Sequence, residues 1–501
     1  MQIFSRPASR QTTSLTTRLR SASAHAAALL LATLASAQTL ARPGWVGSGL
    51  TSQAWWQSAV VYRVQPQSFQ DSDGDGVGDL RGLAQRLDYL QSIGVDAVLV
   101  ASHTNDPGFD DLLSDASRHH IRILVQLGEE TPAQSPTAEQ AMNEARTWLR
   151  RGVAGVYVPS QLLNTIASRS NFQEAVFLLQ ELRTLADSFP GERIVISADS
   201  PSVSAAVSSS PRSGPQIVDG SVNPSTWDAA TLRTRLVLAD SPAAGEPLLQ
   251  IAPHSEQQRD RDKILAALLL SSRGAIGLTY GQEIGLANTT ASAIMRWTPS
   301  NVTKPQVAAA PKPREEIYGA YHPYVPPAPS SVIGSRPHMP SVALNTESAP
   351  PPVDPDTLPG FSTRSLTSPA NTAEATANVA TQDNDHESLL NFYRRVLELH
   401  SSNATLRTGS VSFMNHDTEG ALVWLRRAPT GVRTVASVIV ACNLTDHPIE
   451  ISLDADLAHL HIAAGTLRPL LTSLHFDHIA QPTGHLRLSP HSVYVGELYH
   501  R

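Results

Sequence analysis

The sequence predicts an α/β protein in which a parallel sheet with covering helices is followed by an antiparallel β-domain. Three observations predict this class. Residues 55–100 contain a strand, an acidic loop, a helix and a second strand. Strand-like and helix-like segments then alternate through residues 58–290. From residue 403 onward, short runs rich in Val, Leu and Ile alternate with turn residues.

The first of these segments is a strand–helix–strand unit. Ala59–Val64 is rich in Val and Tyr, as buried strands are. Leucines recur at helical spacing through Leu80–Ile93, and Gly94 ends that predicted helix. Val95–Val100 is a near-continuous apolar strand. A short return between two such strands makes them parallel neighbours in one sheet.

The loop inside this unit is acidic and rich in glycine. Oxygen donors stand at alternate positions, on the side chains of Asp71, Asp73, Asp75 and Asp79 and on the carbonyl of Val77. Such spacing resembles the first part of an EF-hand loop and predicts a Ca²⁺ site. Close carboxylates repel one another unless a cation lies between them. The alternative is a solvated acidic turn without a metal.

The alternation continues to eight βα units. Further strands are predicted at Ile121–Leu127, Val153–Val158, Arg193–Ala198, Gln216–Asp219, Pro247–Ala252 and Ala275–Tyr280. Helices are predicted between them at Phe109–His119, Thr137–Arg151, Phe172–Phe189, Trp227–Leu238 and Glu256–Ser271. The length is close to that of a minimal (β/α)8 TIM barrel.

The rest of the chain is divided by composition. Residues 301–360 hold 14 of the chain's 36 prolines, which predicts an extended or disordered insert. Period-two apolar runs near the C-terminus predict a second domain, an antiparallel β-sandwich. The predicted divisions are 1–37 signal peptide, 38–54 linker, 55–300 with 378–402 barrel, 301–377 Pro-rich insert and 403–501 β-domain.

The N-terminus has the features of a secretory signal. The first 70 residues contain no Asp or Glu, and arginines precede the apolar run Ala26–Leu34. Ala35-Ser36-Ala37 is a cleavage-site pattern, with cleavage expected before Gln38. A secreted or periplasmic protein is expected, and a membrane anchor in Ser21–Ala41 is the alternative. Polar residues make that segment a poor membrane span, and a net charge of −7 argues against a nucleic-acid binder.

The segment WWQSAVVYRVQPQSFQDSDGDGVGDLRGLAQRLDYLQSIGVDAVLV, residues 55–100, resembles a known family. It is similar to the first βαβ unit of the α-glucosidase and oligo-1,6-glucosidase branch of glycoside hydrolase family 13, the α-amylase superfamily. Tyr280–Gly285 resembles the segment that follows the last barrel strand in that family. The resemblance implies a (β/α)8 barrel with a C-terminal β-domain and calcium in the first loop.

The catalytic positions that the resemblance implies carry other residues. In this family the nucleophile ends the motif Gly-x-x-Gly-Phe-Arg-x-Asp, and here Gly152–Pro159 has Tyr157 for the Arg and Pro159 for the Asp. Ala198 stands at the general acid position, and Ser255 stands at the third carboxylate position. Gln126 replaces a further Asp after the third strand. The domain that the family inserts after that strand, and the long loop after the second, are also missing.

Some polar residues lie near other predicted strand ends, namely Glu129, Glu130, Asp199, Asp219, His254 and Glu256. The first interpretation is that they are solvated loop residues. The second is a rebuilt acid–base site, for which Glu130, Asp199 and His254 are the weak candidates. No catalytic residue is therefore assigned from the sequence.

Two functions follow from these observations. The first is a secreted, catalytically inactive α-glucosidase-like protein of carbohydrate metabolism with a binding or interaction role. Its partner is expected to be an oligosaccharide, or a protein that contacts the Pro-rich insert. The second is an active hydrolase of α-linked glucosides with a non-standard carboxylate pair, which requires two carboxyl groups close together in the barrel mouth.

Overall fold

The computed structural model describes residues 54–70, 72–73, 78–101, 108–128, 136–169, 172–199, 214–222, 227–241, 245–252, 261–285, 379–428, 436–474 and 479–499. Residues 55–501 belong to one compact unit. The predicted signal peptide and the Pro-rich insert lie outside the described residues. No helix in the part that the structure describes is both long and apolar enough to cross a membrane.

Eight parallel strands close into a barrel in the order of the sequence, and β8 pairs with β1. The strands are β1 (Val60–Val64), β2 (Ala97–Val100), β3 (Arg122–Gln126), β4 (Gly155–Val158), β5 (Ile194–Ala198), β6 (Ile217–Val222), β7 (Glu246–Ile251) and β8 (Ala275–Thr279). All eight strands were predicted from the sequence. Their alternate residues form two cores, because successive side chains on a strand point to opposite faces.

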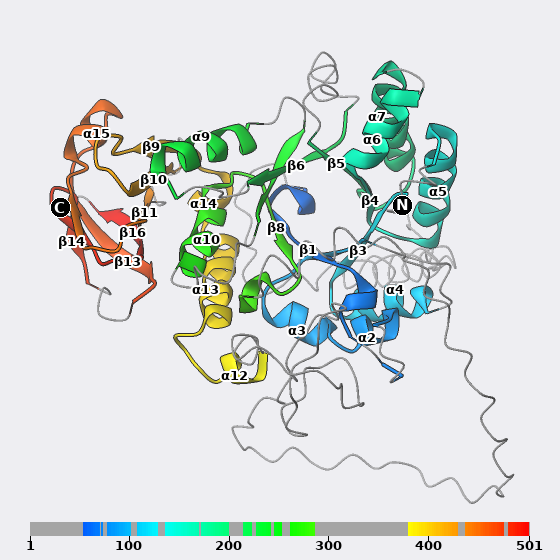
Figure 1. Ribbon diagram of the computed structural model, residues 1–501, viewed down its shortest axis with the longest axis horizontal. Helices are drawn as coiled ribbons and strands as arrows, with labels where there is room; N and C mark the ends of the chain where they lie inside the picture. The colour runs from blue at the N-terminus through cyan, green and yellow to red at the C-terminus, as the bar shows by residue number, and fades with distance from the viewer. Residues whose placement is uncertain are drawn as a thin grey trace, which may run out of the picture. The chain divides into compact units, whose positions relative to one another are not determined.

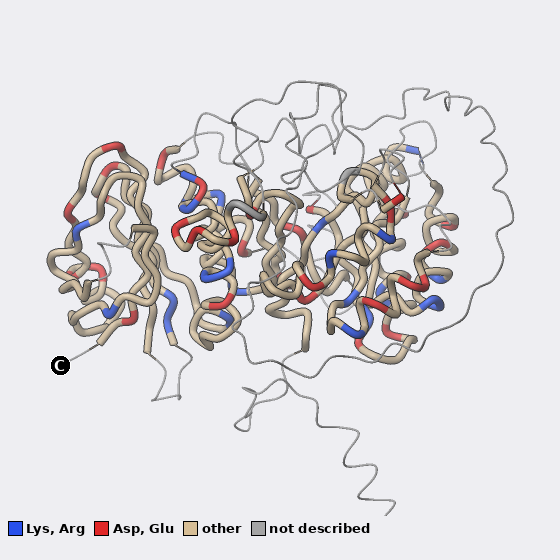
Figure 2. Tube along the Cα trace, turned by 90° about the horizontal axis from the view of Figure 1, so that it is seen from below, with Lys and Arg blue, Asp and Glu red and all other residues tan. Residues whose placement is uncertain are grey.

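The inner core contains residues of every strand, among them Val61, Leu124 and Ile196. The outer core lies between the strands and the surrounding helices (Figure 1). These helices are α2 (Leu80–Ala84), α3 (Leu87–Ser92), α4 (Phe109–Arg118), α5 (Ala138–Arg151), α6 (Ser160–Arg169), α7 (Phe172–Asp187), α9 (Ala229–Ala239) and α10 (Asp262–Leu268). Acidic and basic residues are interspersed over the described part of the chain (Figure 2).

The C-terminal β-domain contains two antiparallel sheets. The larger has the strand order β14-β13-β16-β11-β10-β9, and the smaller pairs β12 with β15. Their bounds are β9 (Ser410–Met414), β10 (Ala421–Arg427), β11 (Val438–Asn443), β12 (Ile449–Ile451), β13 (Thr466–Thr472), β14 (Gln481–Pro482), β15 (Leu486–Leu488) and β16 (Val493–Tyr499). Val423 and Ile439 of the larger sheet share a core with Ile451 and Leu486 of the smaller. The predicted (β/α)8 TIM barrel with a C-terminal antiparallel β-sandwich domain is confirmed.

Short helices complete the described chain: α12 (Val379–Asp383), α13 (Leu389–Ser402), α14 (Ala404–Thr408), α15 (Asp454–His459) and the 3₁₀ turns η2 (Trp55–Ser58), η3 (Pro66–Ser68), η5 (Leu269–Ser271) and η6 (Gln282–Ile284). The barrel-facing side of β10, with Leu422 and Trp424, belongs to the same core as Leu390 and Val396 of α13. Helix α13 therefore links the two domains.

Two details differ from the sequence-based prediction. The single helix expected over Leu80–Ile93 is two helices, because the backbone leaves the helical conformation at Arg86. The Gln85 and Arg86 side chains there hydrogen-bond Gln70. Helix α6 was not predicted, although Leu162, Leu163 and Ile166 stand at helical spacing and are buried.

Candidate functional site

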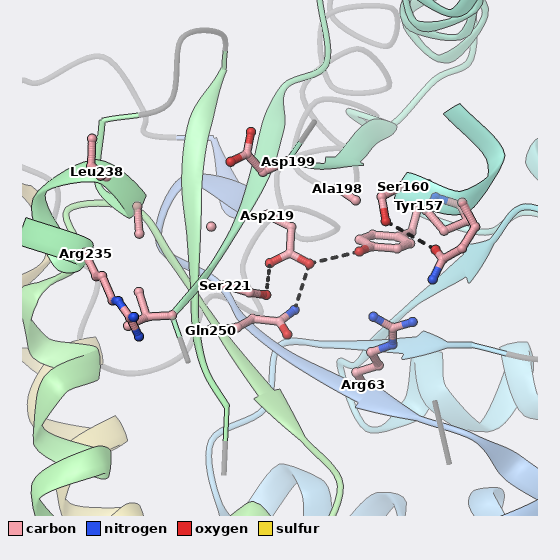
Figure 3. Close-up of a pocket in the computed structure, with 15 residues that line it drawn as sticks. Arg63, Tyr157, Ser160, Ala198, Asp199, Asp219, Ser221, Arg235, Leu238 and Gln250 are labelled. Atoms are coloured by element: carbon pink, nitrogen blue, oxygen red, sulfur yellow. Dashed lines mark hydrogen bonds between the residues drawn. The ribbon is translucent and has the colours of Figure 1, made fainter. Parts of the chain in front are cut away.

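A cavity of about 730 Å³ opens at the C-terminal end of the barrel strands (Figure 3). Its lining comes from β1, β4, β5, β6 and β7 and from the helices α6 and α9: Arg63, Tyr157, Pro159, Ser160, Gln161, Ala198, Asp199, Asp219, Gly220, Ser221, Val222, Arg235, Leu238, Ala239 and Gln250. The size suits a small organic ligand. Ligand and active sites of such barrels lie at this end.

Two of the positions that the resemblance marks as catalytic lie in this lining. Ala198 is the last residue of β5, and Pro159 directly follows β4. Neither side chain has an oxygen, so neither can act as nucleophile or proton donor. The third position, Ser255, lies outside the described residues.

Pro159 has a structural role of its own at the start of α6. Its carbonyl oxygen accepts hydrogen bonds from the amides of Leu162 and Leu163, at 3.1 and 3.3 Å. Proline suits the start of a helix because it lacks the N–H that would have no partner there. The strand end that carries the nucleophile in the family is here the beginning of a helix.

The centre of the cavity is a buried carboxylate, Asp219 on β6 (Figure 3). Its Oδ2 accepts hydrogen bonds from the Tyr157 hydroxyl at 2.9 Å and from Gln250 Nε2 at 3.3 Å. Its Oδ1 accepts one from Ser221 Oγ at 3.3 Å. Only 5% of Asp219 is exposed, so both oxygens are held by neighbours rather than by water.

Arg63 extends this arrangement across the barrel. Its Nη2 donates to Gln126 Oε1 at 2.7 Å, and its guanidinium carbon lies 5.2 Å from the centre of the Tyr157 ring. Asp219, Tyr157 and Gln250 thus join Arg63 and Gln126 in one polar layer, which we call the mouth network. Gln126, which replaces a family Asp, belongs to it.

Burial sets the electrostatics of the mouth network. Desolvation raises the pKa of Asp219, while the charge of Arg63 and the hydrogen bonds from Tyr157 and Ser221 oppose this rise. Desolvation and the Asp219 charge together raise the pKa of Tyr157 above its ordinary value. The Tyr157 hydroxyl therefore stays protonated at neutral pH and acts as a hydrogen-bond donor to Asp219.

Asp199 is the second carboxylate of the cavity lining. It follows the end of β5, and its backbone amide donates to the carbonyl oxygen of Asp219 at 3.2 Å. Asp199 is exposed, whereas Asp219 is buried. The structure thus brings Asp199 to the mouth, while the other weak candidates, Glu130 and His254, lie outside the described residues, as do Glu129 and Glu256.

The predicted calcium loop is described only in part. Asp79 caps α2: its Oδ1 accepts from the Gly82 amide at 2.6 Å, and its Oδ2 accepts from the amide and hydroxyl of Ser72 at 3.2 and 2.9 Å. Asp73 is exposed. Asp71, Asp75 and Val77 lie outside the described residues. The predicted ligands are four carboxylates and one carbonyl oxygen, which fit a hard cation. The Asp79 carboxylate, however, is already hydrogen-bonded as the N-cap of α2.

Sequence reasoning gave Asp219 only as a polar strand end and missed Arg63 and Gln250. The strand alternation contained the signal. Each of the three polar residues stands two positions after an apolar residue of the inner core on the same strand. These pairs are Ile217 and Asp219, Leu248 and Gln250, and Val61 and Arg63. Polar residues at inward positions near the strand ends predict a buried polar layer.

Comparison with known proteins now adds to this geometry. Residues 63–112 match the family model of the α-amylase catalytic domain. The trehalose-6-phosphate hydrolase of Escherichia coli (strain K12) is 37% identical over 113 residues, 18% of this chain and 20% of that protein. The oligo-1,6-glucosidase of Bacillus cereus is 47% identical over 78 residues, 15% of this chain and 13% of that protein.

The matched segment is α-glucosidase-like and belongs to the α-amylase family. The resemblance to this branch of glycoside hydrolase family 13 is thereby confirmed. The chain spans about a fifth or less of the length of these curated relatives. The match to the family model runs from Arg63, near the end of β1, to the start of α4. It includes Arg63 of the mouth network and stops before Gln126, Tyr157, Asp219 and Gln250.

Solved structures extend the likeness to the whole fold. The isomaltulose synthase SmuA from Protaminobacter rubrum has a TM-score of 0.63 at 14% identity and covers 90% of this chain and 100% of that chain. The trehalulose synthase MutB from Pseudomonas mesoacidophila MX-45 has a TM-score of 0.61 at 15% identity and also covers 90% and 100%. At this identity the likeness establishes the fold alone.

Proposed function

We propose that this α-glucosidase-like protein binds a carbohydrate at the barrel mouth and does not hydrolyse it. The observation that carries the proposal is the chemistry of the strand ends. Pro159 and Ala198 line the cavity at the positions implied for nucleophile and general acid. The buried carboxylate of the same cavity, Asp219, is held by three donors of the chain. Retaining hydrolysis needs one carboxyl group to attack and another to protonate the leaving oxygen.

The test combines binding with turnover. Isothermal titration of the purified chain with maltose and isomaltose measures binding, and release of the chromophore from an aryl α-glucoside measures hydrolysis. We expect saturable binding and no turnover above that of heat-denatured protein. Turnover by the folded chain would refute the inactive state, and an absence of binding to every sugar tried would refute the ligand class.

A second candidate is hydrolysis by a rebuilt pair, and one observation favours it. Asp199 and Asp219 line the same cavity from neighbouring strands. Burial raises the pKa of Asp219, which is a property of proton donors in glycosidases. Asp199 would then be the nucleophile.

The two candidates are separated by matched substitutions. Asp199→Asn and Asp219→Asn each abolish any hydrolysis that depends on the rebuilt pair. Glu181→Gln, which changes an exposed carboxylate on α7, is the control and leaves such activity unchanged. Activity that survives both cavity substitutions cannot come from this pair.

Calcium, export and an interaction partner remain proposals as well. The acidic loop would bind Ca²⁺ through Asp71, Asp73, Asp75, Val77 and Asp79 and fix the first βα connection. A ligand that binds only the folded state raises its stability. Chelation is therefore expected to lower the Tm of the wild type and to leave that of Asp73→Asn less changed.

The A-x-A pattern supports export, and the Pro-rich insert is the proposed contact for a protein partner.

A further inference from the structure

A buried histidine lies where the barrel meets the β-domain. His400 is in the last turn of α13, the helix that links the two domains, and it is 0% exposed. Among the described residues, neither of its ring nitrogens has a hydrogen-bond partner. Buried polar groups in proteins are usually hydrogen-bonded, so an imidazole in this state requires an explanation.

One of the two charged groups that act on His400 is a fully buried arginine. Arg426 on β10 is 0% exposed and donates to backbone carbonyl oxygens, while its Nε has no hydrogen-bond partner among the described residues. Its Nη1 donates to Ser271 and Ser272 at 2.9 and 2.5 Å, and its Nη2 donates to Leu406 at 2.6 Å. One side chain of the β-domain thus binds the end of η5 in the barrel and the helix α14.

Charge around His400 has one sign. Arg426 of β10 and Arg407 of α14 are the charged groups that act on it. Burial, followed by these two guanidinium groups, lowers the pKa of His400 to about 3. A helix C-terminus favours a cation, but here burial and like charge prevail.

Other charged groups on the elements that pack against α13 have partners elsewhere. They are Lys263 of α10 with Glu387, Asp383 of α12 with Arg394, Arg468 of β13 with Glu497, and Glu283 of η6 with Tyr62 and Tyr89. Asp262, also on α10, acts on Tyr393 of α13. Asp240, at the end of α9, acts on Arg426. The recorded charges acting on His400 itself are both positive.

We propose that His400 is an acid-sensitive lock between the barrel and the β-domain. While the imidazole is neutral, it is compatible with the charges of Arg426 and Arg407, and the two domains hold together. Once protonated, it adds a third positive charge at a fully buried position, and the contact between α13, α14 and β10 loosens.

The direction with pH follows from linkage. The pKa of His400 is lower in the folded protein than in the unfolded chain, where histidine has its ordinary value near 6.5. The unfolded chain therefore takes up the proton first as the pH falls. Stability contributed by the neutral ring is present above pH 6.5 and is lost below it. Below the unfolded pKa, each further decrease of one pH unit raises the unfolding equilibrium constant about tenfold through this residue.

The experiment is urea unfolding of the full chain at several pH values between 7 and 4.5, followed by tryptophan fluorescence. The wild type is compared with His400→Leu, which fills the site with an apolar group, and with His386→Leu, which changes an exposed histidine. From pH 6.5 to 4.5 we expect the unfolding constant of the wild type to rise about 50-fold more than that of His400→Leu. His386→Leu is expected to follow the wild type.

Hydrogen exchange locates the effect. In the wild type at pH 5, amides of α14 and β10 should lose protection before those of β1–β8, and His400→Leu should abolish this early loss. Parallel pH profiles for wild type and His400→Leu would overturn the proposal. If His400→Leu fails to fold, His400→Gln, neutral at every pH used, gives the same comparison with the same two outcomes.

Discussion

Two buried carboxylates of the barrel, Glu283 and Asp219, accept hydrogen bonds from tyrosine hydroxyls at different places in the barrel. Glu283 follows β8, and its Oε1 accepts from the hydroxyls of Tyr62 and Tyr89 at 2.8 and 2.9 Å. Asp219 accepts from the hydroxyl of Tyr157 at 2.9 Å. Burial raises the pKa of both carboxyl groups.

The difference lies in what surrounds them. Glu283 contacts Tyr62 of β1 and Tyr89 of α3, and Tyr89 lies within the segment that matches the α-amylase family model. Asp219 lies among strands outside that match, where the implied catalytic positions are Pro159 and Ala198. Residues 63–112, from the end of β1 to the start of α4, match the α-amylase family model. At the mouth, the Asp219 carboxylate accepts hydrogen bonds from Tyr157, Gln250 and Ser221, as a buried structural carboxylate does. The mouth network therefore resembles packing more than a site prepared for chemistry.

The largest expected effect tests the barrel side of this comparison. Glu283→Ala leaves the Tyr62 and Tyr89 hydroxyls without their acceptor in a dry site, and each such group costs about 1–3 kcal/mol. We expect the free energy of unfolding in urea to fall by about 4 kcal/mol. Glu283→Gln keeps an accepting oxygen, so its free energy of unfolding should fall by only about 1 kcal/mol. Equal losses for the two variants would mean that the tyrosine contacts are not what matters.

A smaller effect is expected from two glycines, one in the barrel wall and one beneath the mouth. A Cβ at Gly155 would lie 2.4 Å from the carbonyl oxygen of Ile194, so β4 and β5 would have to separate. A Cβ at Gly277 would instead lie 2.3 Å from Gln250 Cγ, and that side chain can turn away from Asp219. We expect Gly155→Ala to cost about 3 kcal/mol and Gly277→Ala about 1 kcal/mol. Chemical denaturation measures the free energy of unfolding of both variants. A larger loss for Gly277→Ala than for Gly155→Ala would show the mouth to be the more rigid region.

An effect of about the size of that of Gly277→Ala is expected in the mouth network itself. Tyr157→Phe removes one donor from Asp219 and should cost about 1–2 kcal/mol. Combined with Asp219→Asn in a double-mutant cycle, it should show a coupling of about 1 kcal/mol. Strict additivity would mean that the 2.9 Å contact contributes nothing to stability.

The pH dependence of Asp219→Asn sharpens the same point. Because the folded pKa of Asp219 is raised above its unfolded value, its contribution is complete below that unfolded pKa and is lost as the pH rises through the folded one. Asparagine does not titrate. The difference in free energy of unfolding between wild type and Asp219→Asn should thus be larger in acid than at neutral pH. A difference that grows toward neutral pH would show that the pKa of Asp219 is lowered instead.

Much of the barrel could be predicted from the sequence because its signals are local. The eight strands are short apolar runs separated by amphipathic segments, and each has the length that one βα unit needs. The break at Arg86 was missed because side chains of Gln85 and Arg86 turn toward Gln70, a contact outside the helix.

The sequence named the residues at the implied catalytic positions but did not predict the mouth network. Replacement of the implied catalytic residues by Pro159 and Ala198 was visible in the sequence, and the structure places both at the cavity. The mouth network was not visible, because Tyr157 and Asp219 are 62 residues apart and Arg63 and Gln126 are 63 apart. Strand closure, rather than any local pattern, brings such residues together.

The sequence by itself determined the eight βα units, the β-domain and the residue types at the implied catalytic positions, since periodicity and residue type are properties of short segments. The tertiary structure alone decided that Asp219 is buried under three donors and that His400 is buried without a hydrogen bond among the described residues. The physical reason is that the charge state of a side chain depends on its solvent and its neighbours. Both are set when strands and helices from distant parts of the chain close around it.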